Sequence, residues 1–178
     1  MSDKLPNIVV TGTPGVGKTS LAMLLADTLN EECKGLKQFT YLNLGKLIKD
    51  KKLYETWNEE YDVPEFDEDK IMDELEPMLN EGGYVVDFHS VYFIPDELIN
   101  IVVLLRCDNT ILYDRLFARG YSEKKIKENI ECEIMEVTSD DVRENFQEHK
   151  IIELSNEQNE QMMSNIEQII QFLKNSYQ

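Results

Sequence analysis

Short apolar runs alternate with segments of helical periodicity along this chain. The runs are almost wholly apolar or β-branched, as is typical of strands covered on both faces. They predict five strands, at Ile8–Val10, Phe39–Leu42, Tyr84–Val86, Ile101–Leu105 and Ile151–Leu154. Apolar residues three or four positions apart predict helices at Lys18–Leu29, Leu44–Lys51, Asp69–Leu79, Asn109–Ala118, Ser122–Val137 and Gln158–Leu173. This alternation indicates an α/β fold with a five-stranded parallel sheet and helices on both faces.

Two segments interrupt the alternation. Residues 44–66 combine a short helix with an acidic, aromatic loop, and residues 119–137 precede the last strand. In an α/β protein such inserts can form substrate and nucleotide lids, or they can be surface packing. Pro77 lies inside the third predicted helix and is expected to kink or end it, because proline has no amide hydrogen to donate.

The segment Gly12–Thr19 reads G-T-P-G-V-G-K-T and follows a predicted strand directly. It fits the phosphate-binding pattern of glycine, four residues and Gly-Lys-Thr, with a helix behind it. The glycines let successive amide groups point inward, Lys18 supplies a charge for the terminal phosphates, and Thr19 can ligate Mg²⁺. This loop therefore predicts a three-layer P-loop fold that binds ATP and Mg²⁺. The expected nucleotide-binding residues are Gly12, Pro14, Gly15, Val16, Gly17, Lys18, Thr19 and Ser20.

Two aspartates end apolar strands and compete for the second position at the metal. Asp87 follows Tyr84–Val86 and is favoured, because His89 and a turn come directly after it. Asp108 precedes a helix, so capping that helix explains it better. Taken alone, His89 is better explained as an ordinary strand-end histidine. Beside Asp87 it becomes a candidate for orienting water or phosphate.

Arg115 and Arg119 are four residues apart on a predicted helix, so they share a face. Two guanidinium groups on one face can clamp phosphate and offset charge during phosphoryl transfer. A pair of surface arginines bound to Asp114 or Glu123 is an equally good interpretation of the spacing.

The length, net charge and cysteine content of the chain argue against several classes of protein. With a length of 178 residues the chain is expected to form one domain, and its formal net charge of −17 argues against broad binding to nucleic acid or anionic membrane. The charge suits a basic protein partner, although a merely well-solvated acidic surface explains it equally well. Cys33, Cys107 and Cys132 are odd in number and form no C-x-x-C pair, which favours reduced thiols and an intracellular setting. We also expect no signal peptide and no membrane span.

Several further motifs resemble the adenylate kinase isoenzyme 6 family, also described as coilin-interacting nuclear ATPases, over nearly the whole chain. The resembling segments are Pro6-Asn7, Thr11–Thr19, Leu53-Tyr54, Asp62-Val63-Pro64, Asp67-Glu68-Asp69, Glu81-Gly82-Gly83, Val86–His89, Arg119-Gly120-Tyr121, Lys124-Lys125, Glu128-Asn129-Ile130 and Cys132-Glu133-Ile134. Two departures stand out, the first from ordinary adenylate kinases and the second from the resembled family. The run after Asp87 lacks the arginine that holds AMP there, an absence the resembled family shares. Lys49 also stands where that family usually has arginine, which keeps the charge but loses the bidentate fork.

The resemblance implies phosphorylation of nucleoside monophosphates by ATP, with AMP the leading acceptor, and an accompanying ATPase activity. It implies Arg119 as the lid arginine and Asp87 with His89 as a modified Walker B pair. It further implies a monophosphate-binding insert near residues 43–66, a lid near 118–128, and a nuclear and cytoplasmic protein. The last implication is a role in small ribosomal subunit maturation, through a basic ribosomal protein.

We therefore expect Lys18, Asp87, His89 and Arg119 to be catalytic. Thr19 would bind Mg²⁺ directly and Asp87 through water. The acceptor would contact Asn43, Gly45, Lys49, Asp87 and His89. Two alternatives stay open: an ATP-hydrolysing assembly factor that grips a ribosomal protein, and a small-molecule kinase of the shikimate or gluconate type.

Overall fold

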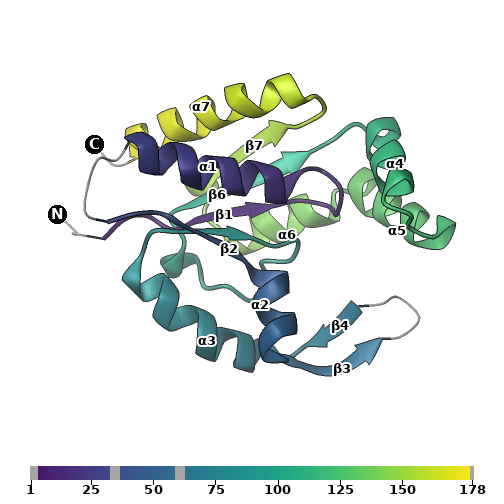
Figure 1. The fold of residues 1–178 in the computed structure, drawn as a ribbon, viewed down its shortest axis with the longest axis horizontal. Helices are drawn as coiled ribbons and strands as arrows, with labels where there is room; N and C mark the ends of the chain where they lie inside the picture. The colour runs from purple at the N-terminus through teal and green to yellow at the C-terminus, as the bar shows by residue number, and fades with distance from the viewer. Residues whose placement is uncertain (1–3, 33–36, 59–62, 177–178) are drawn as a thin grey trace.

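The computed structural model describes residues 4–32, 37–58 and 63–176. Its main sheet has five parallel strands in the order β2-β5-β1-β6-β7 (Figure 1). The strands are β1 (Ile8–Thr11), β2 (Thr40–Asn43), β5 (Tyr84–Asp87), β6 (Ile101–Arg106) and β7 (Ile151–Ser155). All the predicted strands are thus present, and the α/β fold with one five-stranded parallel sheet is confirmed.

Helices cover both faces of this sheet, because successive strand residues point to opposite sides. Ile8 and Val10 of β1 belong to one core cluster, whereas Val9 between them belongs to the other. The first face is covered by α1 (Lys18–Glu32), α4 (Asn109–Ala118), α5 (Glu123–Ile134) and α7 (Asn159–Ser176). The second is covered by α2 (Leu44–Lys51), α3 (Glu68–Glu81) and α6 (Val137–Asn145) (Figure 1). The two clusters and the sheet make the three predicted layers.

A two-stranded antiparallel hairpin stands where the sequence predicts an acidic, aromatic loop. It consists of β3 (Tyr54–Asn58) and β4 (Val63–Phe66) and projects from the sheet beyond α2 (Figure 1). Asp62, which carries part of the family resemblance, lies outside the described residues, as do Tyr61 and Cys33. The strands escape sequence analysis because they do not alternate cleanly between apolar and polar residues.

Pro77 does not end the third helix, so that part of the prediction is wrong, whereas the kink stays a prediction. Helix α3 continues through Pro77 to Glu81, because Ile71, Leu75 and Leu79 bury one face of it in the core. Pro77 itself is exposed. Water can therefore solvate the carbonyl that loses its helical partner, which reduces the usual cost of an interior proline.

The prediction of one continuous helix over Ser122–Val137 is also wrong. Helix α5 ends at Ile134, and α6 begins at Val137 after Glu136, whose φ of 56° is left-handed. Helix α6 continues to Asn145 and buries Val142 beneath the sheet. Two short 3-10 helices, Asp96–Leu98 and Glu148–Lys150, complete the connections to β6 and β7. Within the described ranges, no helix combines the length and apolarity needed to cross a bilayer.

Candidate active site

The glycine loop joins β1 to α1 at the carboxyl edge of the sheet. Gly12, Gly15 and Gly17 have φ angles of 144°, 103° and 101°, which L side chains rarely adopt. A Cβ at Gly17 would lie 2.3 Å from Nδ2 of Asn156, an amide that donates to the carbonyl oxygen of Val16 at 2.7 Å. The loop therefore requires glycine both for its backbone and for its packing. It directs the amino end of α1, where helical amide groups are unpaired, toward the site.

Lys18 is the first residue of α1 and turns back over the loop. Its Nζ donates to the carbonyl oxygens of Gly12, at 2.8 Å, and Thr13, at 3.1 Å. Burial lowers the pKa of Lys18 from 10.5 to about 8, with Arg119 acting in the same direction and Asp87 opposing it. A phosphate dianion at this position would stabilise the protonated lysine and replace its carbonyl partners.

Asp87 lies beside Thr19 because β5 pairs with β1 in the sheet. The Thr19 hydroxyl donates to Oδ2 of Asp87 at 2.6 Å, the Tyr41 hydroxyl donates to the same oxygen at 3.1 Å, and Nδ2 of Asn43 donates to it at 3.4 Å. Burial and the Asp87 charge raise the pKa of Tyr41, which keeps it a donor. Hydroxyl and carboxylate oxygens are ligands that Mg²⁺ prefers, so this pair fits the predicted metal position.

A cavity of about 840 Å³ opens in front of the glycine loop. Lys18 and Thr19 lie on its wall, and Arg119, which follows α4, lies there too. The other lining residues are Thr13, Pro14, Gly15, Gly17, Ser20, Phe66, His89, Ser90, Tyr92, Tyr121, Lys125, Glu128, Asn129, Cys132, Val137, Thr138 and Asp141. Three cationic side chains thus border a cavity of the size that small-molecule ligands occupy.

A second, smaller cavity of about 230 Å³ lies on the other side of the lysine. It is lined by Lys18, Thr19, Asn43, Gly45, Lys49, Phe66, Asp87, Phe88 and His89. The predicted acceptor residues thus surround one space, and four residues line both cavities. Asn43, on the wall of this cavity, also caps α2 by accepting from the amide of Lys46 at 2.8 Å.

His89 separates the two cavities and is neutral at pH 7. Its ring packs against Phe88, with centroids 4.5 Å apart, and against Phe66, at 6.0 Å. Desolvation, with a further contribution from the Lys18 charge, lowers its pKa from 6.5 to about 4. The side chain is also exposed toward the open cavity, where water weakens this effect without changing its direction. His89 can therefore accept or donate one hydrogen bond here but carries no charge.

Three predicted residues lie behind the cavities and not on their walls. Gly12 packs against β6, and the side chain of Val16 is fully buried under the loop. Arg115 does not join Arg119 at the cavity. Its guanidinium donates instead to the carbonyl oxygens of Asn156, at 2.8 Å, and Glu157, at 2.7 Å. Arg115 thereby ties α4 to the loop after β7, and its predicted contact with phosphate stays a prediction.

Asp108 occupies the place that capping predicts. Its Oδ1 accepts from the amides of Thr110, at 2.9 Å, and Ile111, at 3.3 Å, at the start of α4. Of the two strand-end aspartates, only Asp87 contacts Thr19 among the contacts described.

Sequence analysis missed Tyr41 and the contribution of α6. Tyr41 and Asn43 are two residues apart on β2, so they face the same side of the sheet beside Asp87. That pattern could have been recognised only with the strand order known. Thr138 and Asp141 reach the large cavity from α6, a helix that the sequence pattern did not predict.

Comparisons with known proteins agree with this geometry. The model of the AAA-domain family matches residues 8–136. An adenylate kinase isoenzyme 6 homolog from Saccharomyces cerevisiae is 42% identical over 95% of this chain and 82% of its own length. A homolog of the same name from Schizosaccharomyces pombe is 40% identical over 97% of this chain and 94% of its own.

Solved structures share the fold at much lower identity. Shikimate kinase from Bacteroides thetaiotaomicron is 16% identical with a TM-score of 0.63, and covers 95% of this chain and 98% of its own. Shikimate kinase from Acinetobacter baumannii, in complex with shikimate, is also 16% identical with a TM-score of 0.62, over 97% of this chain and 95% of its own. These likenesses establish the P-loop kinase fold, whereas the relatives of higher identity establish the family. With its phosphate loop, its strand-end Asp87 and these relatives, the chain belongs to the adenylate kinase isoenzyme 6 homologs, a family of P-loop nucleotide kinases and ATPases.

Proposed function

We propose that the protein transfers a phosphoryl group from ATP to a nucleoside monophosphate, with AMP the leading acceptor, and that it also hydrolyses ATP. The observation that carries the proposal is the pair of cavities, of about 840 and 230 Å³, that meet at Lys18, Thr19 and His89. Two phosphate-bearing ligands on either side of one lysine suit a transfer between them. An enzyme that only hydrolyses ATP would need only the larger cavity.

The residues then have distinct tasks. The amide groups of the loop and of the amino end of α1 hold the β- and γ-phosphates, and Lys18 exchanges its two carbonyl partners for them. Thr19 and Asp87 would hold Mg²⁺, which would neutralise charge on the phosphates. On the acceptor side, Lys49 and Asn43 border the small cavity. Arg119 would offset charge on the transferred group when the proposed lid, residues 118–128, closes and excludes water.

An acceptor panel tests this proposal. ADP formation from ATP and Mg²⁺ is measured with AMP, CMP, GMP, UMP, shikimate or no acceptor. We expect AMP to stimulate the rate strongly, with two ADP formed per ATP consumed. The Lys18→Ala variant should lose transfer and hydrolysis alike. An unstimulated rate with every acceptor would reject the kinase, and normal turnover of Lys18→Ala would reject the site.

A second candidate function is an assembly ATPase that grips a basic ribosomal protein. The net charge of −17 favours it, because a strongly acidic protein attracts basic partners. Lys49 adds support, since a lysine holds a monophosphate less specifically than an arginine fork does. An ATPase rate that ignores AMP but rises with a basic small-subunit ribosomal protein would favour this candidate over the kinase.

A further inference from the structure

One buried carboxylate beside the glycine loop has no part in the proposed mechanism. Glu133 is near the end of α5, and its side chain is 4% exposed. Oε2 accepts from the Thr13 hydroxyl at 2.5 Å, while Oε1 accepts from Nε of Arg106 at 2.7 Å and from the amide of Cys107 at 3.3 Å. A buried carboxylate is costly unless it is paired and hydrogen-bonded, so this arrangement fixes the side chain in one position.

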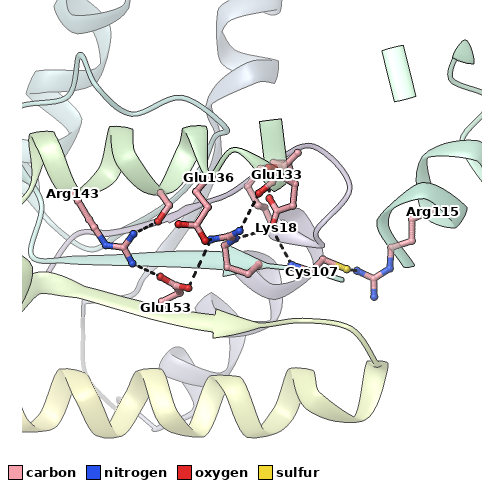
Figure 2. A network of polar contacts seen from close by, with 10 residues as sticks. Lys18, Cys107, Arg115, Glu133, Glu136, Arg143 and Glu153 are labelled. Atoms are coloured by element: carbon pink, nitrogen blue, oxygen red, sulfur yellow. Dashed lines mark hydrogen bonds and ion pairs between the residues drawn. The ribbon is translucent and has the colours of Figure 1, made fainter. Parts of the chain in front are cut away.

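Thr13 connects that carboxylate to the catalytic lysine. While its hydroxyl donates to Glu133, its carbonyl oxygen accepts from Nζ of Lys18 at 3.1 Å. Thr13 is 1% exposed and belongs to the glycine loop itself. Figure 2 shows Lys18 and Glu133 within one network of polar contacts. The bond to Glu133 therefore sets the orientation of the peptide group that Lys18 contacts.

Arg106 pins the same end of α5 to the sheet. The guanidinium binds Glu133 twice, through Nε to the side chain and through Nη2 to the main-chain oxygen at 3.1 Å. Its Nη1 donates to Oε1 of Glu136 at 3.1 Å. Glu136 has a left-handed backbone conformation and turns the chain from α5 into α6. Glu153 and Arg143 continue the network outward to solvent (Figure 2).

Helix α5 also forms a wall of the nucleotide cavity. Lys125, Glu128, Asn129 and Cys132 lie at helical spacing and line that wall. The helix begins at Glu123, inside the proposed lid, and the anchor at Glu133 lies near its far end. Contacts at Glu133 thus connect this wall directly to the phosphate loop.

We propose that Glu133 is a positioning residue for phosphoryl transfer, holding Thr13 of the phosphate loop and, through Arg106, the end of α5 in one fixed relation. The inference rests on the proposed function, since it assigns Glu133 to the reaction carried out at Lys18. Glu133 acts through Thr13 and need not touch the nucleotide. Phosphate on the loop and the position of α5 are consequently linked.

Variants at Thr13 test this link with little change in volume. Thr13→Val removes the hydroxyl that donates to Glu133, whereas Thr13→Ser retains it. We expect Thr13→Val to lower kcat/KM for ATP at least about tenfold, the effect of losing one charge-assisted hydrogen bond, and Thr13→Ser to restore most of the activity. Glu133→Gln should lower it similarly. The double variant should lose less than the product of the two single effects, because both remove the same contact.

Thermal melting without ligand separates this role from a purely structural one. Arg143→Gln, at the outer end of the same network, is the matched control and should keep kcat/KM for ATP within about twofold of wild type, as expected for a surface substitution. The proposal is overturned if Thr13→Val and Glu133→Gln lower only the melting temperature and keep the kinetic constants of wild type.

A measurement on the wild-type protein covers the case in which these variants do not fold. The amide of Cys107 donates to Glu133, and Cys107 lines neither cavity. Saturating ADP with Mg²⁺ should slow hydrogen exchange at this amide, and an unchanged exchange rate would contradict the link. Failure of the proposed function would show differently, as wild-type protein that neither binds ADP nor turns over ATP.

Discussion

The Thr19 hydroxyl donates to the Asp87 carboxylate at 2.6 Å, joining the first turn of α1 to the tip of β5. The contact exists because β5 and β1 are neighbours in the sheet, with Asp87 opposite Val10. It places the hydroxyl and the carboxylate that are predicted to hold Mg²⁺ side by side, while Tyr41 and Asn43 orient the carboxylate from β2. This relationship predicts that the two residues act as a unit.

Replacing the carboxylate with an amide should disable the site without disturbing its packing. Asp87→Asn retains an oxygen for Thr19 and Tyr41 but removes the charge that would hold Mg²⁺. We expect kcat to fall about 100-fold or more, and the Mg²⁺ concentration for half-maximal rate to rise. A Mg²⁺ titration of the steady-state rate measures both. Wild-type kinetics in this variant would show that Asp87 is not the metal-side residue.

The other strand-end aspartate should behave in the opposite way. Asp108→Ala removes the cap of α4 and should lower the free energy of unfolding by about 1 kcal/mol. Asp108→Asn keeps a capping oxygen and should cost little. Chemical denaturation measures the stability, and ATP turnover below the melting transition should stay at the wild-type level in both variants. Loss of turnover in Asp108→Asn would indicate a role at the nucleotide.

Nucleotide affinity should depend on pH through Lys18. Because burial lowers its pKa to about 8, the lysine is protonated at pH 7 and mostly neutral at pH 9 in the free protein. If only the ammonium form binds phosphate, ADP affinity is flat below pH 7 and about tenfold weaker at pH 9, and binding at high pH takes up a proton. Calorimetry in two buffers of different ionisation enthalpy tests this. Equal affinities at pH 7 and 9 would contradict it.

Alanine variants of Gly17 and Gly120 compare the loss of stability caused by a Cβ atom in a packed and in an open position. Both have positive φ, but a Cβ at Gly17 would clash with Asn156, whereas one at Gly120 would meet nothing within 4 Å. Each alanine variant should lose about 1 kcal/mol of stability from backbone strain. Gly17→Ala should lose more and should also bind ADP weakly, because the loop must shift. Equal melting temperatures for the two variants would rule out the clash.

Pro77 offers a stabilising substitution. Helix α3 passes through it, so Pro77→Ala supplies an amide for the helix without changing the buried face. We expect the free energy of unfolding to rise by about 1–2 kcal/mol, less than the full helix penalty of proline, because alanine also loosens the unfolded chain. Thermal melting should therefore shift upward. A lower melting temperature would mean that the ring itself contributes packing.

Local patterns were sufficient for the strands of the main sheet and for the phosphate loop. Strands β1, β5 and β6 consist of buried, mostly apolar runs that end in one polar residue, and such runs have few alternatives to a strand. The phosphate loop could also be predicted locally, because its glycines and the helix behind it are adjacent in sequence. The boundary between helices α5 and α6 was not predicted, because it lies beside a contact between residues far apart in sequence. Glu136, where they break, binds Arg106, which lies thirty residues away in sequence.

The sequence by itself determined the alternation of elements, the phosphate loop and the choice of Asp87 over Asp108 as the metal-side candidate. Tertiary structure alone decided that Tyr41 supports Asp87, that Arg115 binds carbonyl oxygens behind the site, and that Glu133 reaches Thr13 from 120 residues away. The physical reason is the range of the interactions. Helical and strand periodicity arises between near neighbours, whereas the partner of a buried charge is selected by strand order and helix packing across the whole chain.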